Sequence, residues 1–322
     1  MFPFVFPPQF RFIDLLAHAH RGGFDPSWFD GPIELDFTRL RFAGPGAMAC
    51  IKALLARAQR RQPDIRCMVT HELQDPVRYI ARMDFFTDDL RWDMPGAQFD
   101  FVRRESAGRF MPIRNLRFLR ETDPASLETV RCFNVPDRRI ANTLQYALSE
   151  LSDNALQHAG SATVAFVAAQ RYPKTGEVHF TIADTGRTIR GHLVMNPKYA
   201  DVATDQAAIE TALRPFVTGT RIPRPGEGRL EYENQGLGLT VVDALAKRCG
   251  GRLYIWSGTA LYRGGIGIET MPLAWPGTIV FLNLPSQINV NHLDLIREID
   301  QLKVTRTKLT FGTCTPSSRS AP

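Results

Sequence analysis

The chain lacks any uninterrupted apolar run of the length that a membrane-spanning helix requires. Its first twelve residues, MFPFVFPPQFRF, are apolar, but they contain prolines and offer neither a charged start nor a small-residue cleavage site. We therefore do not interpret them as a signal peptide. These absences predict a cytoplasmic protein without a membrane partner.

The sequence also lacks the features of zinc or disulfide-rich domains, of P-loop nucleotide sites and of repeat proteins. It has no CxxC pair, so we expect neither a disulfide framework nor a zinc site. It has no GxxxxGK[ST] sequence, which excludes a P-loop. No internal repeat is present. The cysteines are few and scattered: Cys50, Cys67, Cys132, Cys249 and Cys314.

What is present suffices for two ordinary domains, since the chain has 322 residues. A hydrophobic content of 44% with 22% charged residues is typical of a soluble globular protein. The net charge of +6 permits nucleic-acid contact, but the charge is spread along the chain. The arginines are densest over residues 103–120, where we favour a solvated face or an interdomain contact over a nucleic-acid site.

Sequence patterns divide the chain into five parts. Strand and helix signals alternate within 31–92, and a stronger α/β pattern follows further along, with a helix over 137–158. The parts are an N-terminal extension (1–30), a small α/β unit (31–92), an irregular proline-rich connector with short strands (93–136), the main domain (137–285) and a C-terminal helix with a polar tail (286–322).

The helix over 137–158 carries an apolar stripe and a polar edge. At 100° per residue, Glu150, Asn154 and His158 lie together beside the stripe, whereas Asp153 falls on the solvent side. A carboxylate, an amide and an imidazole one turn apart can reach a shared site. They can equally be the polar rim of an amphipathic helix.

Two further elements carry glycine beside polar groups. Asp184 ends a strand expected over 178–183 and precedes Thr185 and Gly186, whose backbone can approach a ligand closely. The run Gly236-Leu-Gly-Leu239 opens a helix, and a helix N-terminus attracts anions such as phosphate. An ordinary turn and a flexible hinge are the alternatives. The polar segment 196–235 has the length of a functional loop or lid.

Taken in order, these elements resemble the GHKL ATPase superfamily, which includes gyrase, histidine kinases and mismatch-repair MutL. The matching segments are ELSDNALQH at 150–158 (N box), DTGRTI at 184–189 (first glycine box), GLGL at 236–239 (second glycine box) and GTIVF at 277–281 (closing strand). The resemblance covers 137–285. It implies an α/β protein with the GHKL (Bergerat) fold, a two-layer α/β sandwich.

The resemblance implies roles for the matched positions, with ATP and Mg²⁺ as cofactors. Asn154 would ligate the metal, and Glu150 would orient or deprotonate a water that attacks the γ-phosphate. Asp184 would accept a hydrogen bond from the adenine amino group, with Thr278 sharing a water. The segment 196–235 would be the ATP lid. The other ATP-binding positions are His158, Gly186, Thr188, Gly236, Leu237, Gly238 and Leu239.

One feature departs from the family pattern, and another imitates a motif of histidine kinases. Thr188 stands where the first glycine box ends on a glycine, and threonine does not adopt a positive φ cheaply. Thr70-His71-Glu72 looks like the phospho-acceptor box of a histidine kinase. That box belongs to a long helical hairpin, and prolines interrupt the required helices here. We therefore do not assign His71 as a phosphate acceptor.

Residues 31–92 are similar to a STAS domain, the fold of anti-sigma-factor antagonists. The similarity rests on a strand over 33–37, the loop Gly44-Pro45-Gly46 before a helix, and the run from Tyr79 to Phe86. STAS antagonists are switched by phosphorylation of a hydroxyl at this helix start. No hydroxyl is present at that point here, so such a switch is not expected.

The sequence thus predicts an ATP-binding regulator that acts on a protein partner and could form a homodimer, with no nucleic-acid partner. The first hypothesis is a slow Mg²⁺-dependent ATPase or an ATP-gated switch. The alternatives are an anti-sigma-type Ser/Thr protein kinase and a non-catalytic scaffold with structural ATP.

Overall fold

The computed structural model describes residues 2–70, 75–87, 90–94, 108–133, 135–159, 164–215, 217 and 238–288. Several expectations from the sequence lie outside these residues. They concern His71, Gly236 and Leu237, much of the expected lid, and all but the first three residues of the C-terminal part.

The N-terminal unit is built on a parallel sheet, with the order β1-β3-β5-β6 in the described residues. Parallel neighbours need crossover connections, which helices supply here. The strands are β1 (Phe2–Val5), β3 (Ile33–Asp36), β5 (Cys67–Thr70) and β6 (Trp92–Asp93). The helices are α1 (Phe12–His20), η1 (Pro26–Asp30), α2 (Pro45–Arg61) and α3 (Asp75–Arg82). A short parallel pair joins β2 (Gln9–Phe10) to β4 (Phe42–Ala43).

Residues 2–30, expected to be an extension, contribute β1 and α1 to this unit. β1 contains Pro3, which hides its strand character in the sequence. Proline is tolerated there because β1 lies at the edge of the sheet, where one side of the strand needs no ladder hydrogen bonds. Phe4 then packs edge-on against Phe6 and Phe24, which fixes the segment to the core.

The second sheet is antiparallel and has the order β10-β11-β9-β8-β7. Its strands are β7 (Phe110–Leu116), β8 (Ala165–Tyr172), β9 (Glu177–Ala183), β10 (Arg252–Arg263) and β11 (Gly267–Pro285). The expected strands over 164–169 and 178–183 are confirmed as β8 and β9. β10 and β11 run far beyond the expected 252–256 and 278–284, because they form one long hairpin with register shifts near Gly258.

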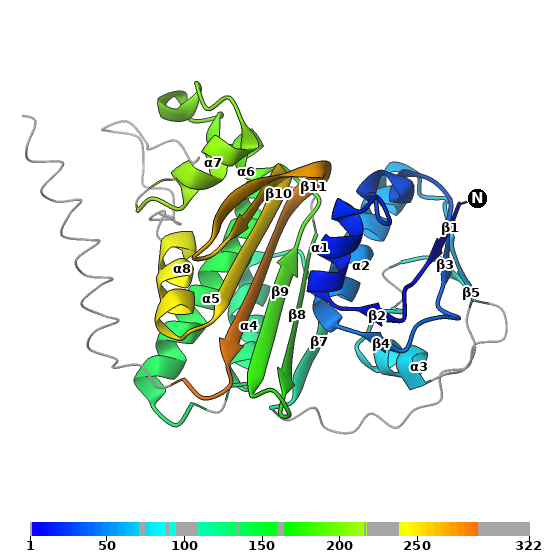
Figure 1. The fold of residues 1–322 in the computed structure, drawn as a ribbon, viewed down its shortest axis with the longest axis horizontal. Coiled ribbons are helices and arrows are strands. Elements are labelled where there is room, and N and C mark those ends of the chain that lie inside the picture. The colour runs from blue at the N-terminus through cyan, green and yellow to red at the C-terminus, as the bar shows by residue number, and fades with distance from the viewer. Residues whose placement is uncertain are drawn as a thin grey trace, which may run out of the picture.

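One face of this sheet is covered by helices from the same part of the chain (Figure 1). The expected stripe of α5 is confirmed, since Ile140, Leu144 and Leu148 are buried in the core that this layer shares with the sheet. The elements on this side include η2 (Leu119–Glu121), α4 (Thr122–Val130), α5 (Arg138–Ala159), α6 (Ile189–Leu193), η3 (Pro197–Tyr199), α7 (Asp205–Ala212) and α8 (Gly238–Arg248).

The connector expected over 93–136 contributes to this domain in its described part. β7 is an edge strand of the antiparallel sheet, and α4 packs against α5. Pro112 lies in β7 at a register shift between Met111 and Arg114, a combination of edge position and bulge that accommodates proline. Pro112, one of the prolines that suggested irregular structure, is therefore compatible with a strand.

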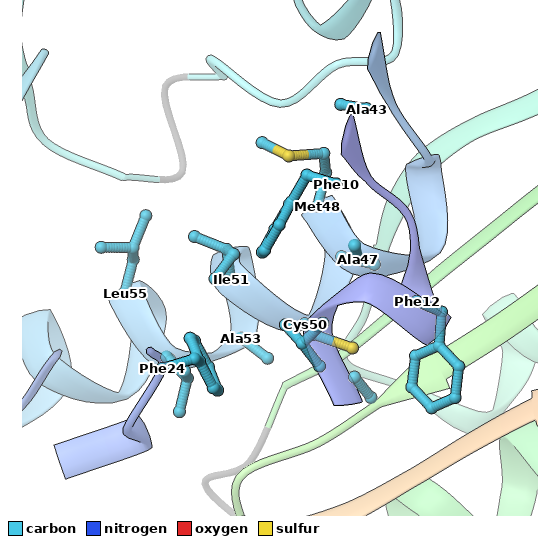
Figure 2. Close-up of a cluster of buried hydrophobic side chains, with 14 of the residues drawn as sticks. Phe10, Phe12, Phe24, Ala43, Ala47, Met48, Cys50, Ile51, Ala53 and Leu55 are labelled. Atoms are coloured by element: carbon cyan, nitrogen blue, oxygen red, sulfur yellow. The ribbon is translucent and has the colours of Figure 1, made fainter. Parts of the chain in front are cut away.

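The opposite face of the antiparallel sheet is covered by α1 and α2, which lie between the two sheets (Figure 1). α2 is buried along most of its length for this reason. Figure 2 shows its side chains Met48, Ile51 and Leu55 among phenylalanines that precede it in the chain. α1 adds Phe12, which stacks on Phe281 of β11 at 4.4 Å between ring centroids. The two-layer sandwich thus continues into the N-terminal unit.

A buried cation marks the same junction. Lys52 of α2 is 1% exposed, and its Nζ donates to the backbone oxygen of Asp84 at 2.8 Å and to the hydroxyl of Thr87. The same ammonium lies 5.6 Å from the ring centroid of Phe166 on β8. A buried charge that lacks water needs such hydrogen bonds. The junction is therefore held by polar as well as apolar contacts.

None of the helices in the described part of the chain has the length and apolarity needed to span a bilayer.

The closest approach between α2 and the antiparallel sheet generates a first prediction. A Cβ on Gly46 would lie 2.1 Å from Oγ1 of the buried Thr181 on β9. Gly46→Ala should therefore lower the free energy of unfolding by roughly 1–3 kcal/mol, despite the better helix propensity of alanine. Urea denaturation measures this. Gly31→Ala is the control, because a Cβ added there would have no atom within 4 Å. Equal effects of the two substitutions would contradict the tight contact.

Candidate functional site

The N-terminal end of α8 meets the polar edge of α5. A Cβ on Gly238 would lie 2.9 Å from Nδ2 of Asn154 and 3.1 Å from Cβ of Glu150. A side chain at this position would crowd both residues, so glycine lets the two helices approach closely. The structure thus brings together Glu150, Asn154 and Gly238, which the sequence analysis predicted for one site. Asn154 and Gly238 are 84 positions apart in the sequence.

Glu150 lies in surroundings that favour its neutral form. Burial raises its pKa, and the negative charge of Asp153 raises it further, while a hydrogen bond from Tyr146 opposes the shift. A carboxylate with a raised pKa holds a proton more readily than an exposed one. That property suits a group that takes a proton from water.

Asp153 differs from the expectation that it faces solvent. Its Oδ1 is buried without a hydrogen-bond partner among the described residues, and its carboxylate interacts with Thr122 of α4. Burial raises its pKa. The prediction was wrong because α4 covers that side of α5, and α4 has no helical period strong enough to be predicted from its residues.

Asp184 follows β9 and is held from several sides. Its backbone N–H donates to the carbonyl oxygen of Thr278 at 2.9 Å, and its own carbonyl accepts from Nε1 of Trp275 at 2.8 Å. Its Oδ1 accepts from the N–H of Gly186 at 2.9 Å. Gly277 lies against it with φ +148°, where an added Cβ would be 2.4 Å from the Asp184 carbonyl. The segment 184–186 is therefore rigidly positioned.

The carboxyl group of Asp184 is 2% exposed, and burial raises its pKa to about 7. Hydrogen bonds from the backbone of Gly186 and Thr278 oppose this shift, as does the positive charge of Arg60. The group is poised between its neutral and charged forms near neutral pH.

Thr188 has a backbone conformation that does not require glycine. Its φ of −67° and ψ of 164° are ordinary extended values, so no positive φ is required. Its Oγ1 accepts from the N–H of Gly191 at 3.0 Å and thereby caps α6. Threonine suits this position better than glycine, because its side chain satisfies an N–H at the helix start.

Ser257 is a connecting residue that the sequence analysis did not identify. Its Oγ accepts from the N–H of Ile189 at 2.9 Å, lies 3.0 Å from Oγ1 of Thr278, and donates to the carbonyl of Gly277 at 2.9 Å. One buried hydroxyl thus joins the start of α6 to β11. No local pattern signals it, since a serine within a strand is common and only the register of β10 and β11 places it here.

The remaining predicted positions are placed in part. Leu239, Ile189 and Leu156 each pack against the same core cluster, and α5 contacts both α6 and α8. His158 lies in α5, but its side chain is outside the described part of the chain, as are Gly236 and Leu237.

The first half of the expected lid is folded against β10. α7 is capped by Thr204, and the carboxylate of Asp205 accepts from the N–H and the hydroxyl of Thr259 at 2.9 and 3.1 Å. The described first half of the segment 196–235 is therefore folded, and the assignment of the whole segment as a lid stays a prediction.

Residues 140–288 match the family "Histidine kinase-, DNA gyrase B-, and HSP90-like ATPase". The chain therefore contains a GHKL ATPase domain, as the sequence predicted, in a region close to the expected 137–285. A solved structure, the nucleotide-free catalytic domain of the histidine kinase ThkA, matches 55% of this chain and 97% of its own length at 13% identity and a TM-score of 0.26. The comparison with curated proteins finds no match.

The raised pKa of Asp184 generates the second prediction. Its neutral form stabilises the fold fully below the ordinary value of 3.8, and this contribution is lost as the pH rises through about 7. The free energy of unfolding of the parent should therefore fall between pH 4 and 7 relative to Asp184→Asn, by at most about 4 kcal/mol. Denaturation at several pH values measures the difference. Asp64→Asn, at a fully exposed side chain, is the control and should follow the parent. Parallel profiles for parent and Asp184→Asn would refute the buried-carboxyl interpretation.

Proposed function

We propose that this chain is an ATP-binding regulator whose GHKL domain slowly hydrolyses Mg·ATP and reports its nucleotide state to a protein partner. The observation that carries the proposal is the contact of Gly238 with Glu150 and Asn154. It brings a helix N-terminus, a carboxylate and a side-chain amide to one place, and each suits a different part of Mg·ATP.

Each group has a chemical task in this proposal. The N-terminal N–H groups and dipole of α8 attract phosphate oxygens. Asn154 supplies a neutral oxygen ligand of the kind that Mg²⁺ accepts beside phosphates. A Mg²⁺ ion held there would neutralise charge on the phosphates. Glu150 orients a water and takes its proton, for which its raised pKa is suited.

Adenine recognition is assigned to the segment that follows β9. Asp184 accepts from the exocyclic amino group of adenine, and the backbone at Gly186 and Thr188 lies alongside. His158, Gly236, Leu237 and Leu239 complete the proposed set, with Thr278 fixing Asp184 through its backbone. The likeness of residues 31–92 to a STAS domain, the cytoplasmic location and a possible homodimer also remain proposals.

The alternatives differ in the fate of the γ-phosphate. A Ser/Thr kinase would transfer it to a protein, and a scaffold would leave it in place. Incubation of the pure chain with γ-labelled ATP and Mg²⁺, with and without a bacterial extract, separates them. Free phosphate supports the ATPase, labelled protein supports the kinase, and intact bound ATP supports the scaffold.

The third prediction concerns the metal ligand. Asn154→Ala should remove measurable binding of a non-hydrolysable ATP analogue in the presence of Mg²⁺, because it deletes the proposed ligand oxygen. Isothermal titration calorimetry measures the affinity with Mg²⁺ and with EDTA. Asn142→Ala is a matched control, the same substitution at an exposed position of α5. A loss of the same size in EDTA would show that Asn154 does not act through the metal.

The fourth prediction separates catalysis from binding. Glu150→Gln should lower phosphate release by about 10²–10⁴-fold while leaving ATP affinity within a few-fold, since a general base need not stabilise the ground state. Glu210→Gln, at an exposed carboxylate of α7, should change neither quantity. If Glu150→Gln hydrolyses ATP at the parental rate, the base lies elsewhere, and His158 becomes the candidate.

A further inference from the structure

The N-terminal unit contacts the segment 184–186, which follows β9. It does so from the face of the antiparallel sheet that α1 and α2 cover. The Nη2 of Arg60, near the C-terminal end of α2, donates to Oγ1 of Thr185 at 3.1 Å. The same hydroxyl approaches the carbonyl oxygen of Ala53 at 3.5 Å. Ala53 and Arg60 are seven residues apart and therefore lie on one face of α2. Two groups of one helix thus hold a residue next to Asp184.

We propose that Arg60 is a positioning residue for the adenine-recognition segment 184–186, through which the docking of the N-terminal unit and ATP affinity are coupled. This inference rests on the proposed function. It adds that an ATPase domain alone is incomplete, because part of the support of its adenine-recognition segment comes from α2.

The contacts on the other side of the segment strengthen the assignment. Asp184 is fixed to β11 through Thr278 and Trp275, and its Oδ1 is held by Gly186. Within the described residues, the side chain of Thr185 turns instead toward α2, where Arg60 and Ala53 contact it. A shift of α2 would therefore act on Thr185 first and be passed to Asp184 through one peptide unit.

The charge of Arg60 adds a second effect. It lowers the pKa of Asp184 against the larger effect of burial, so it favours the ionised carboxylate that accepts from an amino group. Arg60 is an exposed residue whose guanidinium is partly desolvated by its neighbours. Solvent screening limits the size of the effect.

The neighbouring arginine offers a matched control. Arg61 is also exposed and carries the same charge, but it pairs with Asp30 of η1 at 3.5 Å and lies on another side of α2. Arg60→Met and Arg61→Met each remove one charge from adjacent positions and keep a long side chain. A difference between them reports on the contact with Thr185 rather than on net charge.

The test measures affinity for a non-hydrolysable ATP analogue by calorimetry between pH 5.5 and 8.5 in the full chain. Arg60→Met should weaken binding by about three- to tenfold at pH 7 and move the midpoint of the pH profile upward. Arg60→Lys should keep the midpoint near that of the parent, because it retains the charge. Arg61→Met should match the parent in both quantities.

The outcomes distinguish this inference from the function on which it rests. If the parent chain binds no adenine nucleotide, the proposed function fails. If the parent binds and Arg60→Met behaves as Arg61→Met does, the coupling is wrong and the proposed function stands. Should Arg60→Met not fold, Thr185→Val removes the accepting hydroxyl at nearly constant volume. It should weaken binding to a similar extent, and parental affinity in that variant would overturn the inference.

Discussion

The fold depends on the burial of α2 between two sheets. Antiparallel sheets often leave one face to water, but here helices cover both faces of β10-β11-β9-β8-β7. The second covering helix belongs to a different unit, so its docking must satisfy both sheets at once. Small residues make this possible where the contact is tightest, as at Gly46 against Thr181. Met48 and Ile51 of the same helix are buried among phenylalanines of the N-terminal unit.

This arrangement explains why the candidate site has two kinds of support. The contact of Gly238 with Glu150 and Asn154 lies within the ATPase domain and depends on the packing of α5 and α8. The segment around Asp184 lies at the end of a central strand, where residues from β11 and from α2 both reach it. The first contact therefore belongs to the domain alone, whereas the second depends on the junction of the two units.

The sequence was sufficient where a pattern is long and local. The stripe of α5 and the hairpin of β8 and β9 follow from period and turn chemistry. It failed where tertiary context overrides a local signal. Proline in β1 concealed an edge strand of the first sheet, and the weak helical period of α4 concealed that helix.

Residues whose role depends on partners far away in the sequence could not be predicted either. Asp153 is shielded by a helix that the pattern did not predict, and Ser257 owes its place to strand register. The contact of Arg60 with Thr185 joins positions 125 residues apart, and no spacing rule connects them.

The burial of the start of α2 limits how a signal could reach the ATPase domain. Pro45, Gly46 and Ala47 are buried there, so the start of the helix has neither a hydroxyl nor space for an added bulky group. The C-terminal end of the same helix is exposed from Arg60 onward. A partner that bound this end could move the contact with Thr185 without opening the apolar junction. Because coupling between two sites is reciprocal, nucleotide binding would then change the affinity for that partner by the same factor.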